Sequence, residues 1–476
     1  MTFMLIVALL AVLRLWRLTA YGLFSDEVFS AETAHRAWPQ LQRAVVTDVV
    51  HPPLFYYLLK AWIAAGDALV WMKLLPVLFA LLAIIPFVLL CRELKLRPMT
   101  INLALCLMAV NEYLINYAQE LRMYSLLLLL VVTSMWLFAK LINASNRALA
   151  VQVALLAANL LLVYTHYYGW LIVAGELLFV IVKRRDLLVS FTLSVAVLVV
   201  GFAPWAMAVI KAASDKGGLG PNLKWNTHPT VTDFFQHYVT LNGPVYTSWR
   251  AYAMVFSSAL FFTPILLWAW RLRGKEKVNG EEANVLAWLA LLAFLPAVIA
   301  FAASYLLAQA VWGSRFLIVV APAYLLLIAV AATELRRPAL RRVVVALMAA
   351  WAALSGGLQL THRDKVNWQP LVERMIQQQA DSADRVSVYT AQGVAGITIE
   401  YYLNQANEQR LRVHYIDDYS QIADARFWIA FLRYRHETGP LPSEVFTARG
   451  DRLGEAIEAD APGHKVVFLH VERERR

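Results

Sequence analysis

Long apolar runs separated by short polar connections make up most of the first 360 residues of the chain. A helix needs about 20 predominantly apolar residues to cross a bilayer, and eleven runs approach or exceed that length. They lie at residues 2–22, 69–91, 99–116, 121–142, 147–163, 167–182, 187–210, 251–270, 284–308, 316–333 and 341–360. The pattern predicts a mainly α, polytopic membrane protein in which residues 1–360 form one transmembrane domain of about 11 spans.

A shorter apolar stretch at 52–65 lies in the long connection 24–68, between the first two predicted spans. It is too short to cross a bilayer and begins with Pro52-Pro53, so we expect an interfacial or re-entrant helix. If this stretch crossed the membrane, every later connection would change sides.

The composition changes from residue 361, where charged residues become frequent and short segments alternate between apolar and polar. Strands are predicted at 385–389, 411–416, 427–432 and 465–471, with helices at 368–379 and 394–404. Residues 361–476 should therefore form a small α/β domain. Their sequence contains no Gly-rich phosphate loop, nucleophile elbow or metal-ligand spacing, which favours a covering or recognition role over a catalytic one.

Charge sets the predicted orientation. The net charge is +10, yet the basic residues concentrate in alternate connections, as the positive-inside rule explains without a nucleic-acid partner. These connections contain Arg92, Lys95 and Arg97; Lys140 and Arg147; Lys183, Arg184 and Arg185; Arg271, Arg273, Lys275 and Lys277; and Arg336, Arg337, Arg341 and Arg342. We expect them to be cytoplasmic, which places the connection 24–68 and the C-terminal domain on the other side of the membrane.

Asp26 and Glu27 follow the first predicted span directly. Carboxylates so close to hydrocarbon are costly, so chemistry at the membrane face is a better explanation for them than stability. The alternative is that this acidic pair caps the start of a following helix.

Four further polar clusters are predicted to reach the same face. The segment 48–57 contains His51 and Tyr56, and the segment 119–124 contains Glu120, Arg122 and Tyr124. His166 lies in a turn rich in tyrosine, and Arg315 lies directly before an apolar span. An aromatic interfacial belt would also explain the histidines and tyrosines, and Arg315 could simply extend to lipid headgroups. Cys91 and Cys106, the two cysteines, are read as small buried apolar residues.

These clusters carry a resemblance to a known family. The segments, in chain order, are SDEVFSAETA, HPPLFYYLL, QELRMYSLLLLL, YTHYYGW and SRFLIVVAPAYLLL. They resemble the bacterial polyprenyl-phosphate-sugar glycosyltransferases related to protein O-mannosyltransferases and to the lipid A aminoarabinose transferase, which are similar to glycosyltransferase family 39. The resemblance covers about residues 1–335. It implies a GT-C-type helix bundle in a bacterial inner membrane, with an external loop whose acid, here Asp26, is the proposed catalytic base.

The chemistry then expected is transfer of a hexosyl or pentosyl group from a polyprenyl phosphate to the hydroxyl of a lipid, polysaccharide or protein, with inversion. Asp26 would take the proton of the acceptor, while Glu27 and Glu120 would orient the acceptor or an arginine. Arg122 and Arg315, with Lys60 as a weaker third, would hold the leaving lipid phosphate. His51, Tyr56, Tyr124 and His166 would contact the substrates. The spacing of the acids demands no metal ion, although it is compatible with a divalent cation.

Two other classes of protein share some of these features. A lipid or sugar transporter would place its charges near the midplane of the membrane and show inverted repeats, whereas these charges cluster at one face. A glycan polymerase or ligase would be expected to keep its main site in a large later loop.

Overall fold

The computed structural model describes residues 2–143, 149–215, 228–243, 250–273, 280–359, 366–379, 384–434, 441–461 and 464–473. Arg147, Lys275 and Lys277 of the predicted cytoplasmic connections lie outside these ranges. The chain divides into two compact units, one made of Met1–Trp16 and Thr33–Thr361, the other of Arg17–Glu32 and His362–Arg476. The segment after the first helix therefore groups with the C-terminal residues.

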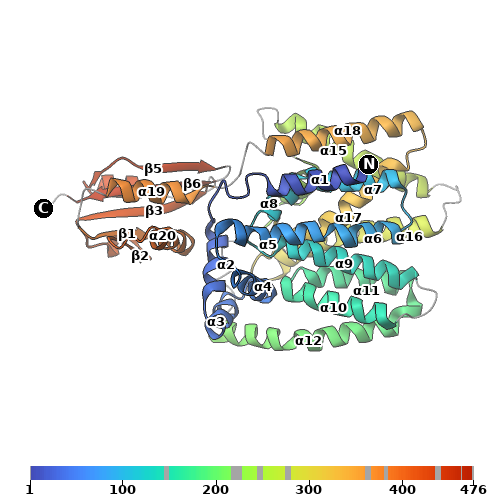
Figure 1. Ribbon diagram of the computed structural model, residues 1–476, viewed down its shortest axis with the longest axis horizontal. Helices are drawn as coiled ribbons and strands as arrows, with labels where there is room; N and C mark the ends of the chain where they lie inside the picture. The colour runs from blue at the N-terminus through green and yellow to red at the C-terminus, as the bar shows by residue number, and fades with distance from the viewer. Residues whose placement is uncertain are drawn as a thin grey trace. The chain divides into compact units, whose positions relative to one another are not determined.

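The first unit is a bundle of helices (Figure 1). Its elements are α1 (Thr2–Leu15), α3 (Trp38–Asp48), α4 (Leu54–Ile63), α5 (Leu69–Leu82), α6 (Ile84–Glu93), α7 (Pro98–Val110), α8 (Glu112–Ala118), α9 (Tyr124–Asn143), α10 (Leu149–Thr165), α11 (Gly169–Lys183), η1 (Arg185–Leu187), α12 (Leu188–Asp215), α14 (Val231–Leu241), α15 (Arg250–Arg273), α16 (Gly280–Leu306), η2 (Phe316–Val320), α17 (Ala321–Thr333) and α18 (Pro338–Gln359). α2 (Ser25–His35) begins in the second unit and ends in the first.

The protein is a multi-pass membrane protein. Within the described ranges, seven helical stretches are long and apolar enough to cross a membrane, and α7 with α8, bent by 60°, makes an eighth if the pair is one span. The predicted runs at 2–22, 147–163 and 167–182 form shorter helices of 14, 17 and 15 residues. α4 has 10 residues, about 15 Å of helix, and is too short to cross.

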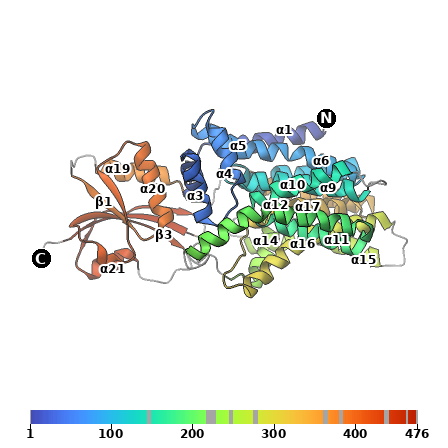
Figure 2. The same ribbon diagram turned by 90° about the horizontal axis from the view of Figure 1, so that it is seen from below.

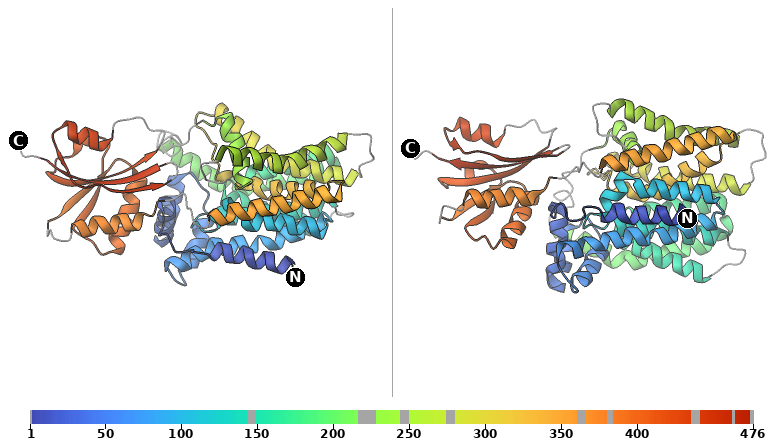
Figure 3. Two further views of the ribbon diagram at one scale, coloured as in Figure 1. Left: turned by 90° about the horizontal axis from the view of Figure 1, so that it is seen from above. Right: turned by 45° about the horizontal axis from the view of Figure 1, so that its top comes forward.

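The centre of the bundle is α17. The stretch Phe316–Thr333 is buried along its whole length, because it is apolar on every side. α9 is largely buried as well, whereas α12 exposes most of its apolar surface, as expected of a helix that faces lipid. α7 packs between α1 and α18 (Figure 3).

A buried polar cluster joins α9, α10 and α11. Ser134 Oγ lies 2.6 Å from Asn159 Oδ1 and 2.7 Å from Glu176 Oε1. Asn159 Nδ2 donates a hydrogen bond to Glu176 Oε2 at 3.0 Å. All three side chains are buried, so these contacts satisfy polar groups that would otherwise be costly inside the bundle.

The C-terminal unit contains a six-stranded sheet with the order β2-β1-β3-β6-β4, in which β5 also pairs with β6. The strands are β1 (Val386–Thr390), β2 (Leu411–Tyr415), β3 (Arg426–Tyr434), β4 (Arg452–Leu453), β5 (Ile457–Ala461) and β6 (His464–Glu472). β1 pairs in parallel with β2 and β3, while β6 is antiparallel to β3, β4 and β5. The parallel part follows from the helix α20 (Gly393–Gln405), which connects β1 to β2.

Apolar residues cover both faces of this sheet. α19 (Trp368–Gln378) and α20 pack on one face, where Trp368, Ile399 and Phe468 share a buried core. α21 (Pro442–Ala448) lies on the opposite face, where Phe446 packs against Phe427 (Figure 2). The fold class predicted from the sequence, a helix bundle with a small C-terminal α/β domain, is thus confirmed.

Candidate active site

Four connections of the bundle meet around one group of side chains. They are the segment before α4, the junction of α8 and α9, the turn between α10 and α11, and the segment before η2. Ring contacts join three of these connections, since the ring centroids of His51, His166 and Phe316 lie within 6 Å of one another. Arg122, at the junction of α8 and α9, connects the fourth through its contact with His51.

Arg122 lies at the junction of α8 and α9 and is only 4% exposed. Its Nη1 is 3.4 Å from Tyr56 Oη, and its Nη2 is 3.4 Å from His51 Nδ1. Asp48 Oδ2 lies 3.9 Å from the same nitrogen of His51. A buried guanidinium is a suitable group for binding an anion, because its planar fork of N–H donors can meet two oxygens of a phosphate.

His166 provides a second donor. Its Nδ1 accepts a hydrogen bond from the backbone N–H of Tyr168 at 3.1 Å, so the neutral ring carries its proton on Nε2. Burial, and then the charges of His51, Arg122 and Arg315, hold the pKa of His166 well below its usual value. Nε2 is buried and has no hydrogen-bond partner among the residues that the structure describes. Its N–H is therefore available to a ligand oxygen.

Arg315 lies directly before η2, and its side chain is half-buried. Its guanidinium carbon lies 5.3 Å from the centroid of the Phe316 ring. Hydrogen bonds from two tyrosines fix this segment, from Tyr113 Oη to the carbonyl of Ser314 at 2.6 Å and from Tyr168 Oη to that of Val311 at 2.6 Å. The backbone that carries Arg315 is thus held by α8 and by the turn before α11.

Tyrosines at the junction of α8 and α9 were only partly anticipated. Tyr117 packs edge-on against Tyr113 and Tyr124, with ring centroids 4.6 and 4.7 Å apart. Glu120 is 8% exposed and lies near enough to Tyr113 and Tyr117 to interact electrostatically with both phenols. Tyr124 and Glu120 were predicted from the sequence. Tyr113 and Tyr117 were not, although their spacing of four residues puts both on one face of α8.

The structure gives Lys60 a different set of contacts. Its ammonium donates hydrogen bonds to the carbonyls of Ala34 at 3.2 Å and Arg36 at 2.6 Å, and it lies 5.4 Å from the centroid of the Trp38 ring. These contacts fix the end of α2 to α4. They account for Lys60 without a phosphate.

Asp26 and Glu27 occupy the first turn of α2. Glu27 Oε2 accepts a hydrogen bond from the backbone N–H of Phe24 at 3.0 Å, which is how an acid three positions into a helix caps its start. Glu27 is buried and also contributes to the raised pKa of Tyr402, whose hydroxyl donates to the carbonyl of Leu23 at 2.7 Å. Asp26 is half-buried.

No group of three or more His, Cys, Asp or Glu side chains within the described ranges is arranged to hold a metal ion. Cys91 is buried, Cys106 is partly buried, and both are free thiols.

Comparison with known proteins bears on the fold. No protein-family model and no curated protein matches the chain. ArnT from Cupriavidus metallidurans bound to undecaprenyl phosphate is 14% identical, with a TM-score of 0.56 over 98% of this chain and 97% of ArnT. Its apo structure matches at the same identity and coverage with a TM-score of 0.55. An oligosaccharyltransferase from Archaeoglobus fulgidus gives 0.47 at 12% identity, over 86% of this chain and 64% of its own. ArnT is a lipid A aminoarabinose transferase, and the chain described here has the GT-C fold that ArnT represents.

Proposed function

We propose that the protein is a membrane glycosyltransferase that moves a hexosyl or pentosyl group from a polyprenyl phosphate to an acceptor hydroxyl. The observation that carries this proposal is the group formed by the buried Arg122 and His166 and the half-buried Arg315, in a fold shared with a protein that binds undecaprenyl phosphate. We place the reaction on the extracytoplasmic face of a bacterial inner membrane, where sugars must arrive on a lipid carrier.

The proposed donor site uses the two arginines and the histidine. As the bond between the sugar and the phosphate breaks, negative charge grows on the phosphate oxygens. The guanidinium groups of Arg122 and Arg315 and the Nε2–H of His166 would strengthen their contacts with those oxygens at that moment, which lowers the barrier. His166 suits this role because it stays neutral and so needs no change of protonation.

The proposed base is Asp26. Inversion requires the acceptor hydroxyl to attack the anomeric carbon from the face opposite the phosphate, and a carboxylate must take its proton. Such a base contributes about 100-fold to 10,000-fold to the rate. Asp26 is chosen because it matches the acid that is the proposed base in the family that the sequence resembles, whereas the carboxylate of Glu27 caps the start of α2.

The remaining site residues have proposed roles in orienting the arginines and the substrates. His51 and Tyr56 would orient Arg122 through the contacts that they make with its guanidinium. Tyr124 and Glu120 would shape the sugar end of the site, with Glu120 acting on the acceptor or on Arg315. Lys60 remains the weakest candidate for the phosphate because its ammonium already binds two carbonyls.

The proposal is tested by incubating the purified protein in nanodiscs with undecaprenyl-phosphate-linked pentoses and hexoses and measuring the undecaprenyl phosphate released. We expect release with at least one donor when envelope lipids, polysaccharide and protein are added as acceptors. Mass spectrometry of lipids and glycans from a deletion strain would then identify the acceptor. Absence of release with every donor and acceptor would contradict the proposal.

A further inference from the structure

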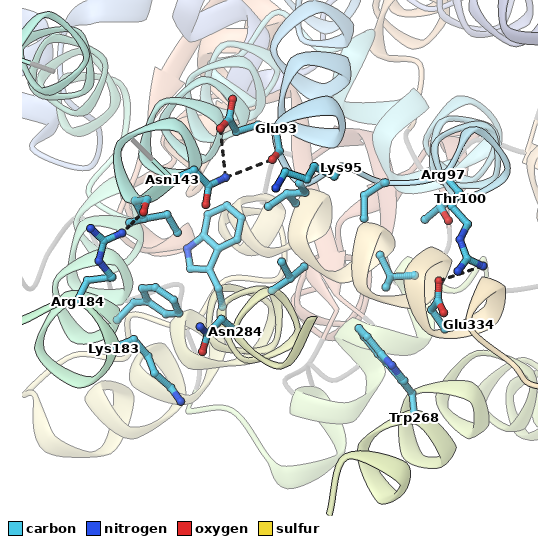
Figure 4. Close-up of a pocket in the computed structure, with 17 residues that line it drawn as sticks. Glu93, Lys95, Arg97, Thr100, Asn143, Lys183, Arg184, Trp268, Asn284 and Glu334 are labelled. Carbon is cyan, nitrogen blue, oxygen red and sulfur yellow. Dashed lines mark hydrogen bonds and ion pairs between the residues drawn. The ribbon is translucent and has the colours of Figure 1, made fainter. Parts of the chain in front are cut away.

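A cavity of about 600 Å³ lies at the end of the bundle that carries the basic connections (Figure 4). Its walls come from the ends of α6, α9, α11 and α17 and from the start of α16. The volume is that of a typical small-molecule site. None of its lining residues belongs to the candidate active site.

The cavity and the candidate active site lie at opposite ends of the same helices. α9 begins at Tyr124, beside Arg122, and ends at Asn143, which lines the cavity. Its 20 residues span about 30 Å, the thickness of the hydrocarbon core. If Arg122 and Arg315 lie at the headgroup level of one leaflet, the cavity lies at the headgroup level of the other.

The rim of the cavity is basic. Lys95, Arg97, Lys183 and Arg184 line it together with Glu93 and Glu334, so the basic side chains exceed the acidic ones by two. Three contacts fix the rim itself: Arg97 pairs with Glu334 at 3.6 Å, Arg184 with Asp186 at 2.7 Å, and Asn143 Nδ2 donates to Glu93 Oε1 at 3.1 Å.

Lys183 is the cation best placed to receive a ligand. Its side chain is exposed at the end of α11 and makes no ion pair in the part of the chain that the structure describes. No dashed line reaches its ammonium in Figure 4. Lys95, also exposed, follows the end of α6 on the same rim.

The floor is apolar. Phe179, Trp268, Trp288 and Val330 line the cavity and are buried in the bundle. A ligand that satisfies both parts must therefore carry an anionic group next to hydrocarbon. Membrane lipids with a phosphate headgroup have this chemistry, and they are present at this depth at high concentration.

We propose that this cavity binds the phosphate headgroup of a membrane lipid, with the phosphate at the basic rim to which Lys95 and Lys183 belong and the adjoining carbons packed against the apolar floor. Two lipids share this chemistry, an anionic phospholipid and polyprenyl phosphate itself. The inference rests on the cavity and its charges alone, so it does not depend on the proposed glycosyl transfer.

The test is native mass spectrometry of the delipidated full-length protein titrated with phosphatidylglycerol, phosphatidylcholine, undecaprenyl phosphate or inorganic phosphate. We expect Lys95→Glu/Lys183→Glu to weaken binding of phosphatidylglycerol, undecaprenyl phosphate or both at least tenfold. The matched control is Arg337→Glu/Arg342→Glu, which makes the same charge change on two exposed residues, one directly before α18 and one on it, both outside the cavity. It should change the affinity less than twofold.

The lipid whose binding falls in the lysine variant identifies the source of the headgroup. An equal loss in both variants would show a general surface charge effect and overturn the proposal, as would inorganic phosphate binding as tightly as the lipids. Should the double glutamate variant fail to fold, Lys95→Gln/Lys183→Gln is measured in its place, and unchanged affinity there would also overturn the proposal.

Discussion

Burial distinguishes the two arginines of the candidate active site, because Arg122 is 4% exposed and Arg315 is half-buried. A lysine at either position keeps the charge but loses the planar fork that meets two phosphate oxygens. We expect Arg122→Lys to weaken undecaprenyl phosphate binding by about 10-fold to 100-fold, equivalent to one charge-assisted hydrogen bond, and Arg315→Lys to weaken it less. Binding to purified variants, measured by isothermal titration, checks this.

The control for that measurement is Arg36→Lys, an exposed arginine just after α2, which should bind as wild type does. If these arginines merely extended to lipid headgroups, lysine would serve equally well at both positions. Wild-type affinity in Arg122→Lys and Arg315→Lys would therefore remove both from the donor site.

His237 on α14 is a second residue whose environment predicts a measurable effect. It is 1% exposed among Tyr113, Tyr238 and Trp312, and burial lowers its pKa to about 3. An unfolded histidine titrates near pH 6.5, so below that pH the unfolded chain binds the extra proton and stability falls, by up to about 1.4 kcal/mol per pH unit. Above about pH 6.5 this residue does not contribute to any pH dependence.

His237→Phe should remove this pH dependence, because phenylalanine does not titrate. The substitution should cost little, since neither ring nitrogen of His237 has a hydrogen-bond partner among the described residues. Thermal unfolding at pH 8 should be nearly unchanged, and the drop in melting temperature between pH 6.5 and pH 4.5 should be smaller than in wild type. The same drop in both proteins would show that His237 is protonated in the folded state.

Among the elements, α7 and α18 depend on one glycine for their close approach. A Cβ at Gly356 would collide with the backbone carbonyl oxygen of Val110, whereas a Cβ at Gly357 would meet no atom within 4 Å. Alanine stabilises a helix relative to glycine by about 0.5–1 kcal/mol where there is room for it. We therefore expect Gly357→Ala to unfold at or above the wild-type temperature.

Gly356→Ala should instead destabilise the protein by about 1–3 kcal/mol, the usual cost of forcing extra volume into a packed contact. Thermal unfolding of the two variants side by side makes each the control of the other. Equal melting temperatures would mean that α7 and α18 do not pack at this contact.

The polar cluster of α9, α10 and α11 predicts the protonation state of Glu176. Ser134 has one proton for its two short contacts, so three matched hydrogen bonds among Ser134, Asn159 and Glu176 require a proton on the carboxyl group of Glu176. The same count holds if the amide of Asn159 is turned round. Glu176→Gln supplies a permanent donor and should keep wild-type stability.

Glu176→Ala should cost about 1–3 kcal/mol because it leaves Ser134 and Asn159 unsatisfied inside the bundle. The two variants are compared by thermal unfolding, and infrared spectroscopy should show a protonated carboxyl band that Glu176→Gln removes. Equal destabilisation by glutamine and alanine would contradict this protonation state.

For the whole molecule, the sequence was most informative where a pattern is long or repeated. The predicted strand at 465–471 became β6 (His464–Glu472), and the predicted helix at 368–379 became α19 (Trp368–Gln378), because alternation and helical periodicity report burial directly. The two-residue strand β4 was missed because so short a segment carries no period. The prediction of about 11 spans stays a prediction, because seven or eight of the eleven runs form described stretches long enough to cross a membrane and the other three form shorter helices. The first run was predicted too long, since α1 ends at Leu15 and Arg17 follows it at φ 53°.

The residues of the candidate site could also be predicted from the sequence only in part. Arg122, His51 and His166 were named from the sequence and do come together in the bundle. Phe316, which packs against both histidines, read as the first residue of an apolar span. Which apolar residue faces a site depends on tertiary packing, which no local pattern records. The hydrogen bonds of Lys60 to the carbonyls at the end of α2 depend in the same way on the contact between two helices.

We have proposed that the protein transfers a sugar from a polyprenyl-phosphate-linked donor with Asp26 as the base. The most direct test is a single-turnover transfer assay of Asp26→Asn beside Glu32→Gln, an exposed acid of the same helix that loses the same charge. We predict that Asp26→Asn slows transfer by about 100-fold to 10,000-fold while donor affinity stays within about twofold of wild type, and that Glu32→Gln transfers normally. Transfer by Asp26→Asn within about tenfold of wild type, or an equal loss in Glu32→Gln, would contradict the role of Asp26 as the base.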